Sequence, residues 1–100
     1  MKLEFKNTRS SALSLMRSAG YRFIRNNDRT GEEEYQRRIT GGLYPRFHIF
    51  LKTEKDSIQI NLHLDQKSAS YEGFRAHSGE YEDSEVVKRE AENISKIFRN

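Results

Sequence analysis

Cysteine is absent from this chain of 100 residues. The absence excludes disulfide bonds and thiolate metal sites, so any metal site must use histidine and carboxylate side chains. Long apolar runs are lacking as well. The N-terminal segment does not have the apolar length of a signal peptide, and no stretch approaches the roughly 20 apolar residues that span a bilayer. We therefore expect a soluble protein of the cytoplasm.

Two common enzyme signatures are missing too. Neither of the usual glycine-rich phosphate loops occurs, and Gly41-Gly42 alone is typical of a turn. Ser78 follows His77, but no Gly-x-Ser-x-Gly motif surrounds it. Nucleotide hydrolysis and catalysis by a serine nucleophile therefore have no motif in their favour.

The clearest pattern in the chain is the alternation of apolar and polar residues over 58–65. Charged residues make up 33% of the chain and hydrophobic residues 34%, and here the hydrophobic residues occupy every second position. Residues 46–52 alternate in the same sense. A hairpin through residues 53–57 would therefore place His48 close to His63 on a shared polar side.

Further elements are predicted in the first half of the chain. Residues 2–6 alternate as a short strand, and a helix follows after a cap at Asn7 or Thr8. Gly20 stands where a left-handed residue would end that helix. Two strands of a second hairpin are predicted over residues 21–25 and 34–40.

The second half ends in an amphipathic helix. Residues 74–77 predict a brief return to extended structure, and Asp83 or Ser84 then caps a helix. Its apolar stripe consists of Val87, Ala91, Ile94 and Phe98. The predicted fold is a single α+β domain with two layers: an antiparallel sheet of four to five strands, with an N-terminal and a C-terminal helix on one face.

The histidines suggest one possible chemistry. Asp65 follows His63 at the spacing that puts two side chains on the same side of a strand. Neighbouring strands lie about 4.8 Å apart, so such groups can meet at one divalent ion. The candidate ligands for Zn or another divalent metal are His48, His63, Asp65 and His77. The alternatives are a metal-free acid/base pair of His and Asp, or solvated polar residues opposite a buried face.

The arginines suggest a second function, the binding of an anionic partner. Every basic residue from Arg9 to Arg46 is an arginine, and aromatic residues lie among them. Arginine suits phosphate, and aromatic rings can stack on unpaired bases. The pattern indicates binding of RNA, DNA or another anionic partner, with candidate residues Arg22, Arg25, Arg37, Arg38 and Arg46. The alternative is that the rings fill the core while the arginines pair with the acidic run at 32–34.

Residues 13–25 resemble the opening of HicA-like mRNA interferase toxins, with a helix that ends in Ser18-Ala19-Gly20-Tyr21 and continues into Phe23-Ile24-Arg25. That resemblance implies a double-stranded-RNA-binding-like fold of helix, three strands and helix. It implies no activity, because the catalytic histidine of those toxins lies on an early strand and residues 21–40 contain none.

Three other blocks, at residues 44–48, 61–67 and 76–81, resemble those of a family of short bacterial proteins without an established activity. The blocks contain all three histidines.

These observations favour a small cytoplasmic binding module for RNA, DNA or an anionic partner over an enzyme. A metal-dependent hydrolase that uses the His/Asp cluster is the second hypothesis. The third is a protein-interaction module or homodimer, for which Phe50 on the predicted polar face is the best indicator. No membrane partner is expected.

Overall fold

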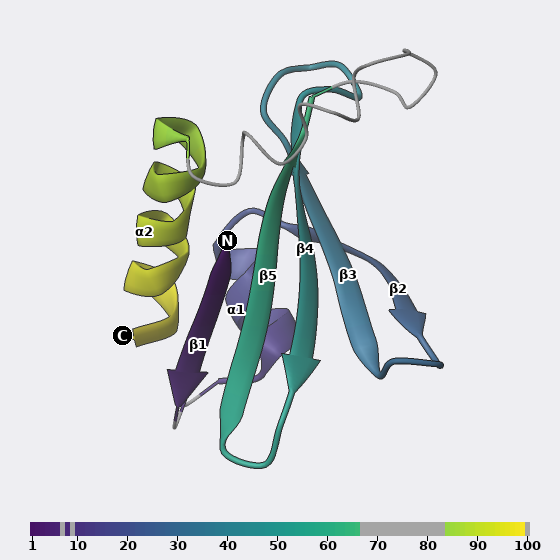
Figure 1. The fold of residues 1–100 in the computed structure, drawn as a ribbon, viewed down its shortest axis with the longest axis vertical. Helices are drawn as coiled ribbons and strands as arrows, with labels where there is room; N and C mark the ends of the chain where they lie inside the picture. Colours follow the sequence, from purple (N-terminus) through teal and green to yellow (C-terminus); the bar gives the residue numbers. More distant parts are fainter. Residues whose placement is uncertain (7, 9, 67–83, 100) are drawn as a thin grey trace.

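The computed structural model describes residues 1–6, 8, 10–66 and 84–99, which form the sheet and the two helices of Figure 1. In chain order the elements are β1 (Lys2–Lys6), α1 (Ala12–Ser18), β2 (Arg22–Asn27), β3 (Glu32–Arg38), β4 (Arg46–Thr53), β5 (Ser57–Asp65) and α2 (Glu85–Arg99). No helix in these ranges is both long and apolar enough to cross a bilayer.

The strands form one antiparallel sheet in the order β1-β5-β4-β3-β2. The first strand pairs with the last, so β1 forms one edge and β2 the other (Figure 1). In the β4–β5 hairpin, His48 is the register partner of His63, and Phe50 is the partner of Asn61. The predicted α+β class and the predicted hairpin are confirmed.

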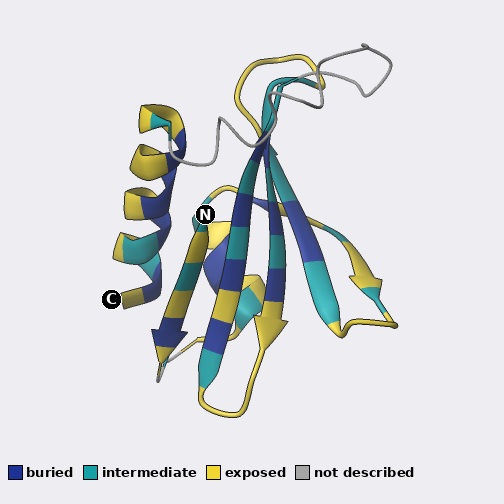
Figure 2. Cartoon of the chain, in the orientation of Figure 1, coloured by how far each residue is buried: buried dark blue, intermediate teal, exposed yellow. Residues whose placement is uncertain are grey.

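The core lies between this sheet and the two helices. Alternate residues of β4 and β5 are buried there, which Figure 2 shows as dark and light bands along both strands. The predicted stripe of α2 is buried against them. The core residues of the hairpin and of the two helices are Phe47, Ile49, Leu51, Ile58, Ile60, Leu62, Leu64, Leu15, Met16, Val87, Ala91, Ile94 and Phe98. Both described helices pack on this face, so neither of them lies over the other face of the sheet.

Helix α1 begins later than predicted. Ser11 is its cap, because the Ser11 hydroxyl oxygen accepts a hydrogen bond from the Ser14 backbone N–H at 3.2 Å. The predicted caps Asn7 and Thr8 are wrong, because Ser11 offers the same chemistry directly before the turn that buries Leu15. Gly20 ends the segment with φ of 90°, as expected.

The β2–β3 hairpin is shifted relative to its predicted bounds. Its turn is held by the Asn27 side-chain oxygen, which accepts hydrogen bonds from the backbone N–H groups of Arg29 and Thr30 at 3.0 and 3.4 Å. Both strands therefore reach further toward the turn, and Ile39 lies outside β3 with 42% of its surface exposed. The extended segment predicted over residues 74–77 lies outside the described residues.

An ion pair anchors α2 to the sheet. Arg37 donates from Nη2 to Glu90 Oε1 at 2.6 Å and from Nε to Glu90 Oε2 at 3.2 Å. The Tyr21 hydroxyl donates to the same Oε2 at 2.6 Å. Glu90 is only 3% exposed, so these bonds compensate a carboxylate that has lost its water. Burial, followed by the bond to Glu90, raises the pKa of Tyr21 far above its ordinary value, so Tyr21 stays a neutral donor.

Candidate nucleic-acid interface

The face of the sheet that points away from the helices is called the open face below. Strand alternation and register place basic side chains from β1, β2, β3 and β4 on it. Its basic residues are Lys2, Lys6, Arg22, Arg25, Arg38, Arg46 and Lys52, and its acidic residues are Glu4, Glu32, Glu34 and Asp65. Basic groups therefore outnumber carboxylates on the open face, in keeping with the net charge of +3.

His48 lies at the centre of this face, between two carboxylates. Its Nδ1 is 3.3 Å from Asp65 Oδ2, and its Nε2 is 3.2 Å from Glu34 Oε1. An imidazolium can donate to both carboxylates, whereas a neutral ring donates to only one. The arrangement therefore favours the protonated form of His48.

The pKa values follow from this geometry. The hydrogen bond to Asp65 raises the pKa of His48 above its ordinary value, against the effect of partial burial, and Glu34 acts in the same direction. Burial by itself would raise the pKa of Asp65, but hydrogen bonds from His48 and Arg46 lower it below its ordinary value. His48 is thus a cation near neutral pH more often than a free histidine would be.

Arginines extend this pair into a row of alternating charges. Arg46 Nε lies 3.2 Å from Asp65 Oδ2, and Arg25 Nη1 lies 3.7 Å from Glu34 Oε1. Glu34 is only 7% exposed, so its contacts with Arg25 and His48 compensate a largely buried charge. The resulting row, called the charge row below, consists of Arg25, Glu34, His48, Asp65 and Arg46.

The predicted arginine cluster is divided between the two faces. Arg22, Arg25, Arg38 and Arg46 lie on the open face, and Arg38 and Arg46 are register partners in neighbouring strands. Arg37 lies on the helix face, where it holds Glu90. Strand alternation separates neighbours such as Arg37 and Arg38, so Arg37 is not part of this surface.

The predicted metal ligands are brought together only in part. His48, His63 and Asp65 share the open face, but both ring nitrogens of His48 contact carboxylates. Within residues 1–66 and 84–99, apart from the undescribed positions 7 and 9, no three His, Cys, Asp or Glu residues are placed to hold a metal ion. His77, the fourth ligand, lies outside the described residues, so the metal site stays a prediction.

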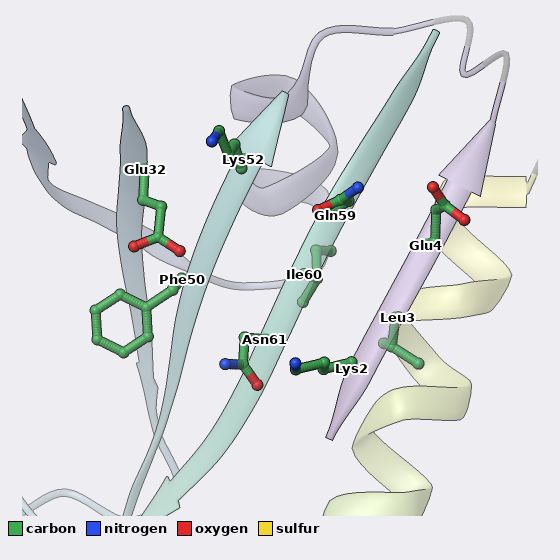
Figure 3. A pocket seen from close by; sticks show the side chains of 9 residues that line it. All are labelled: Lys2, Leu3, Glu4, Glu32, Phe50, Lys52, Gln59, Ile60 and Asn61. Atoms are coloured by element: carbon green, nitrogen blue, oxygen red, sulfur yellow. The ribbon is translucent and has the colours of Figure 1, made fainter. Parts of the chain in front are cut away.

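Phe50 gives the open face an aromatic centre. Its ring stacks on that of His48 with centroids 4.6 Å apart, and it meets the ring of His63 edge-on at 5.8 Å. In Figure 3 the Phe50 ring is seen face-on beside β4, with the helices behind the sheet. Phe50 is only partly buried, so an aromatic ring remains accessible on the face that carries the basic groups.

A hollow of about 410 Å³ adjoins Phe50. It extends over β3, β4, β5 and β1, and Figure 3 shows the side chains around it. Its lining consists of Lys2, Leu3, Glu4, Glu32, Phe50, Lys52, Gln59, Ile60 and Asn61. The sequence patterns single out Phe50 alone from this set. The contributions of β1 and β3 follow from strand order, which alternation within one strand does not reveal.

Comparisons with protein-family models, with curated proteins and with solved structures find no match for this chain.

Proposed function

We propose that the protein binds single-stranded nucleic acid, in particular RNA, on its open face. The observation that carries the proposal is the position of Phe50: a partly buried ring on the face of the sheet where neither described helix packs, stacked on His48 and sharing that face with basic side chains. Buried rings serve packing, but a ring in this position serves packing poorly. Its exposed face suits stacking with an unpaired base.

Charge supports the same function. Arg22 and Arg38 are exposed on the open face, and Arg46 lies with its guanidinium 4.6 Å from the centre of the Tyr44 ring. Arg38 and Arg46 stand side by side across β3 and β4, so their guanidinium groups can hold one phosphate from two directions. Binding through such contacts releases counterions and must weaken as salt rises.

Single strands fit this surface better than duplexes. Bases in a duplex are stacked on one another, so a flat sheet with a single exposed ring gains no stacking from them. An unpaired strand can lay one base on Phe50 while its phosphates follow the arginines. Stacking of a base on an aromatic side chain contributes about 1–3 kcal/mol.

The direct test measures the affinity of a fluorescently labelled ten-nucleotide RNA by anisotropy at two salt concentrations. Phe50→Ala should weaken binding at least about fivefold, because it removes the stacking surface. Phe23→Ala is the matched control, since Phe23 is 40% exposed but lies on the helix face of β2, where it contacts Tyr35. Its affinity should remain that of the unmodified protein.

A duplex of the same sequence and heparin serve as competitors in this test. The proposal predicts that the duplex binds more weakly than the single strand and that Phe50→Ala leaves binding to heparin unchanged. Salt-independent binding, or equal affinities of Phe50→Ala and the unmodified protein for the single strand, would contradict it. Loss of heparin binding in Phe50→Ala would point to a general anion site.

A further inference from the structure

The lining of the hollow beside Phe50 combines an aromatic ring with carboxylate, amide and ammonium groups. Phe50 and Asn61 are register partners in β4 and β5, and Lys2 is the partner of Asn61 in β1. The next row consists of Lys52, Gln59 and Glu4. In Figure 3 the Glu32 carboxylate, from β3, lies above the Phe50 ring and the Asn61 amide, from β5, lies to its lower right. A flat ligand lying on Phe50 would therefore meet polar groups at two of its edges.

Two of these groups are carboxylates without partners. Across the part of the chain that the structure describes, the Glu4 and Glu32 carboxylates make no hydrogen bond or ion pair. A carboxylate only accepts hydrogen bonds, whereas the amides of Gln59 and Asn61 both donate and accept. The hollow therefore carries carboxylate and amide acceptors beside the ammonium donors of Lys2 and Lys52, and the unpaired carboxylates suit an edge of a ligand that donates.

The volume of the hollow matches a small planar ligand. Sites for small molecules measure about 300–1,000 Å³, and this one, at about 410 Å³, lies near the lower end. Lys2 and Lys52 at its rim can contact phosphate oxygens as point charges. These features fit a site for one nucleotide of a strand. An aromatic ring forms one wall, amides and carboxylates supply acceptors, and two ammonium groups lie nearby.

We infer that the hollow holds a single unpaired base with an exocyclic amino group, so that adenine, cytosine or guanine binds there in preference to uracil. The inference rests on the proposed binding of single-stranded RNA. The inference adds a preference for certain bases. The amino group of the base donates to the Glu32 carboxylate from β3, and the Asn61 amide from β5 contacts another edge of the base. Uracil lacks an amino group, and its one base-edge donor, N3–H, lies between two carbonyl oxygens that a carboxylate repels, so uracil pairs less well with Glu32.

The test uses four labelled oligouridine strands of equal length that differ only in the central base, which is adenine, cytosine, guanine or uracil. The unmodified protein should bind at least one amino-bearing strand about fivefold or more tightly than the all-uracil strand. Glu32→Gln should reduce that ratio toward one, because the amide can also donate a hydrogen bond to the carbonyl oxygens of uracil. Glu92→Gln, at an exposed residue of α2 outside the hollow, should leave the ratio unchanged.

Circular dichroism establishes that each variant is folded before its affinities are compared. Equal affinity for all four strands, or a ratio that Glu32→Gln does not alter, would overturn the inference and leave the proposed RNA binding intact, provided that Phe50→Ala still weakens binding. Absence of binding to every strand would overturn both proposals together.

Discussion

At the scale of single residues, His48 carries the most information about the open face. Its two ring nitrogens contact Asp65 and Glu34, and these contacts raise its pKa. A histidine whose pKa is higher in the folded state stabilises the fold at low pH and loses that contribution as pH rises through the folded value. Asp65, whose pKa is lowered, contributes above its ordinary value of 3.8 and loses that contribution as pH falls through its lower folded value. Both contributions are therefore present together near pH 5–6, between the two ordinary values.

His48→Gln tests this assignment. The difference in melting temperature between the unmodified protein and His48→Gln should be largest at about pH 5–6 and should shrink toward pH 9, above the ordinary histidine value of 6.5. Thermal unfolding followed by circular dichroism at several pH values gives the measurement. Gln36→Ala, a neighbour of His48 without a titrating group, should show a difference that does not vary with pH. A His48→Gln difference that is constant or grows with pH would refute the charge row.

Arg37 and Arg38 are adjacent in the sequence but lie on opposite faces of the sheet, so their substitutions should have different effects. Arg37→Met leaves the buried Glu90 carboxylate without its cation, so the free energy of unfolding in urea should fall by about 3 kcal/mol or more. Arg38→Met should change it by less than about 0.5 kcal/mol, because Arg38 is exposed. RNA binding should show the opposite order, with Arg38→Met weakened and folded Arg37→Met unaffected. Equal effects of both variants on stability would contradict the assigned roles.

At the scale of elements, the sequence predicts the β4–β5 hairpin well because burial on one side forces a period of two. The shared face of His48 and His63 follows from that period and is confirmed by their register. Glu34 beside His48 was missed, because the pairing of β3 with β4 depends on the long connection through residues 39–45, which alternation does not describe. The prediction put Arg37 and Arg38 in one cluster for a different reason: it counted charge along the sequence, although alternation in a strand puts adjacent residues on opposite faces.

The start of α1 shows a second limit. Several residues before this helix can act as caps, and local chemistry ranks Asn, Ser and Thr almost equally. The choice depends on which turn Leu15 and Met16 bury against the sheet, and that is a tertiary effect. Prediction from local sequence alone therefore places the helix correctly but not its first residue.

Two substitutions test the observed cap. Ser11→Ala should lower the free energy of unfolding by about 1 kcal/mol, because the N–H of Ser14 loses its acceptor. Thr8→Ala, at the predicted position, should change it by less than about 0.5 kcal/mol. Urea denaturation of both variants measures the difference. A larger effect at Thr8 than at Ser11 would show that the helix begins earlier in solution.

At the scale of the whole molecule, the two faces of the sheet carry different groups, and we propose that one face serves stability and the other recognition. Its helix face holds the core and the Arg37–Glu90 pair, and its open face holds the charge row, Phe50 and the hollow. Substitutions on the two faces should therefore fall into two groups, one affecting unfolding and one affecting binding. A chain of this size can sustain the separation because one face of an antiparallel sheet need not be buried.

The most direct test of the account is a titration of isotope-labelled protein with single-stranded RNA, followed by backbone and side-chain amide signals in NMR spectra. The account predicts that the largest shifts lie on the open face of β3, β4 and β5, at Arg38, His48, Phe50 and Asn61. Residues on the outer side of α2, such as Glu92 and Lys96, should keep their positions. Shifts concentrated on α2, or unchanged spectra at saturating RNA, would contradict the claim that the open face binds nucleic acid.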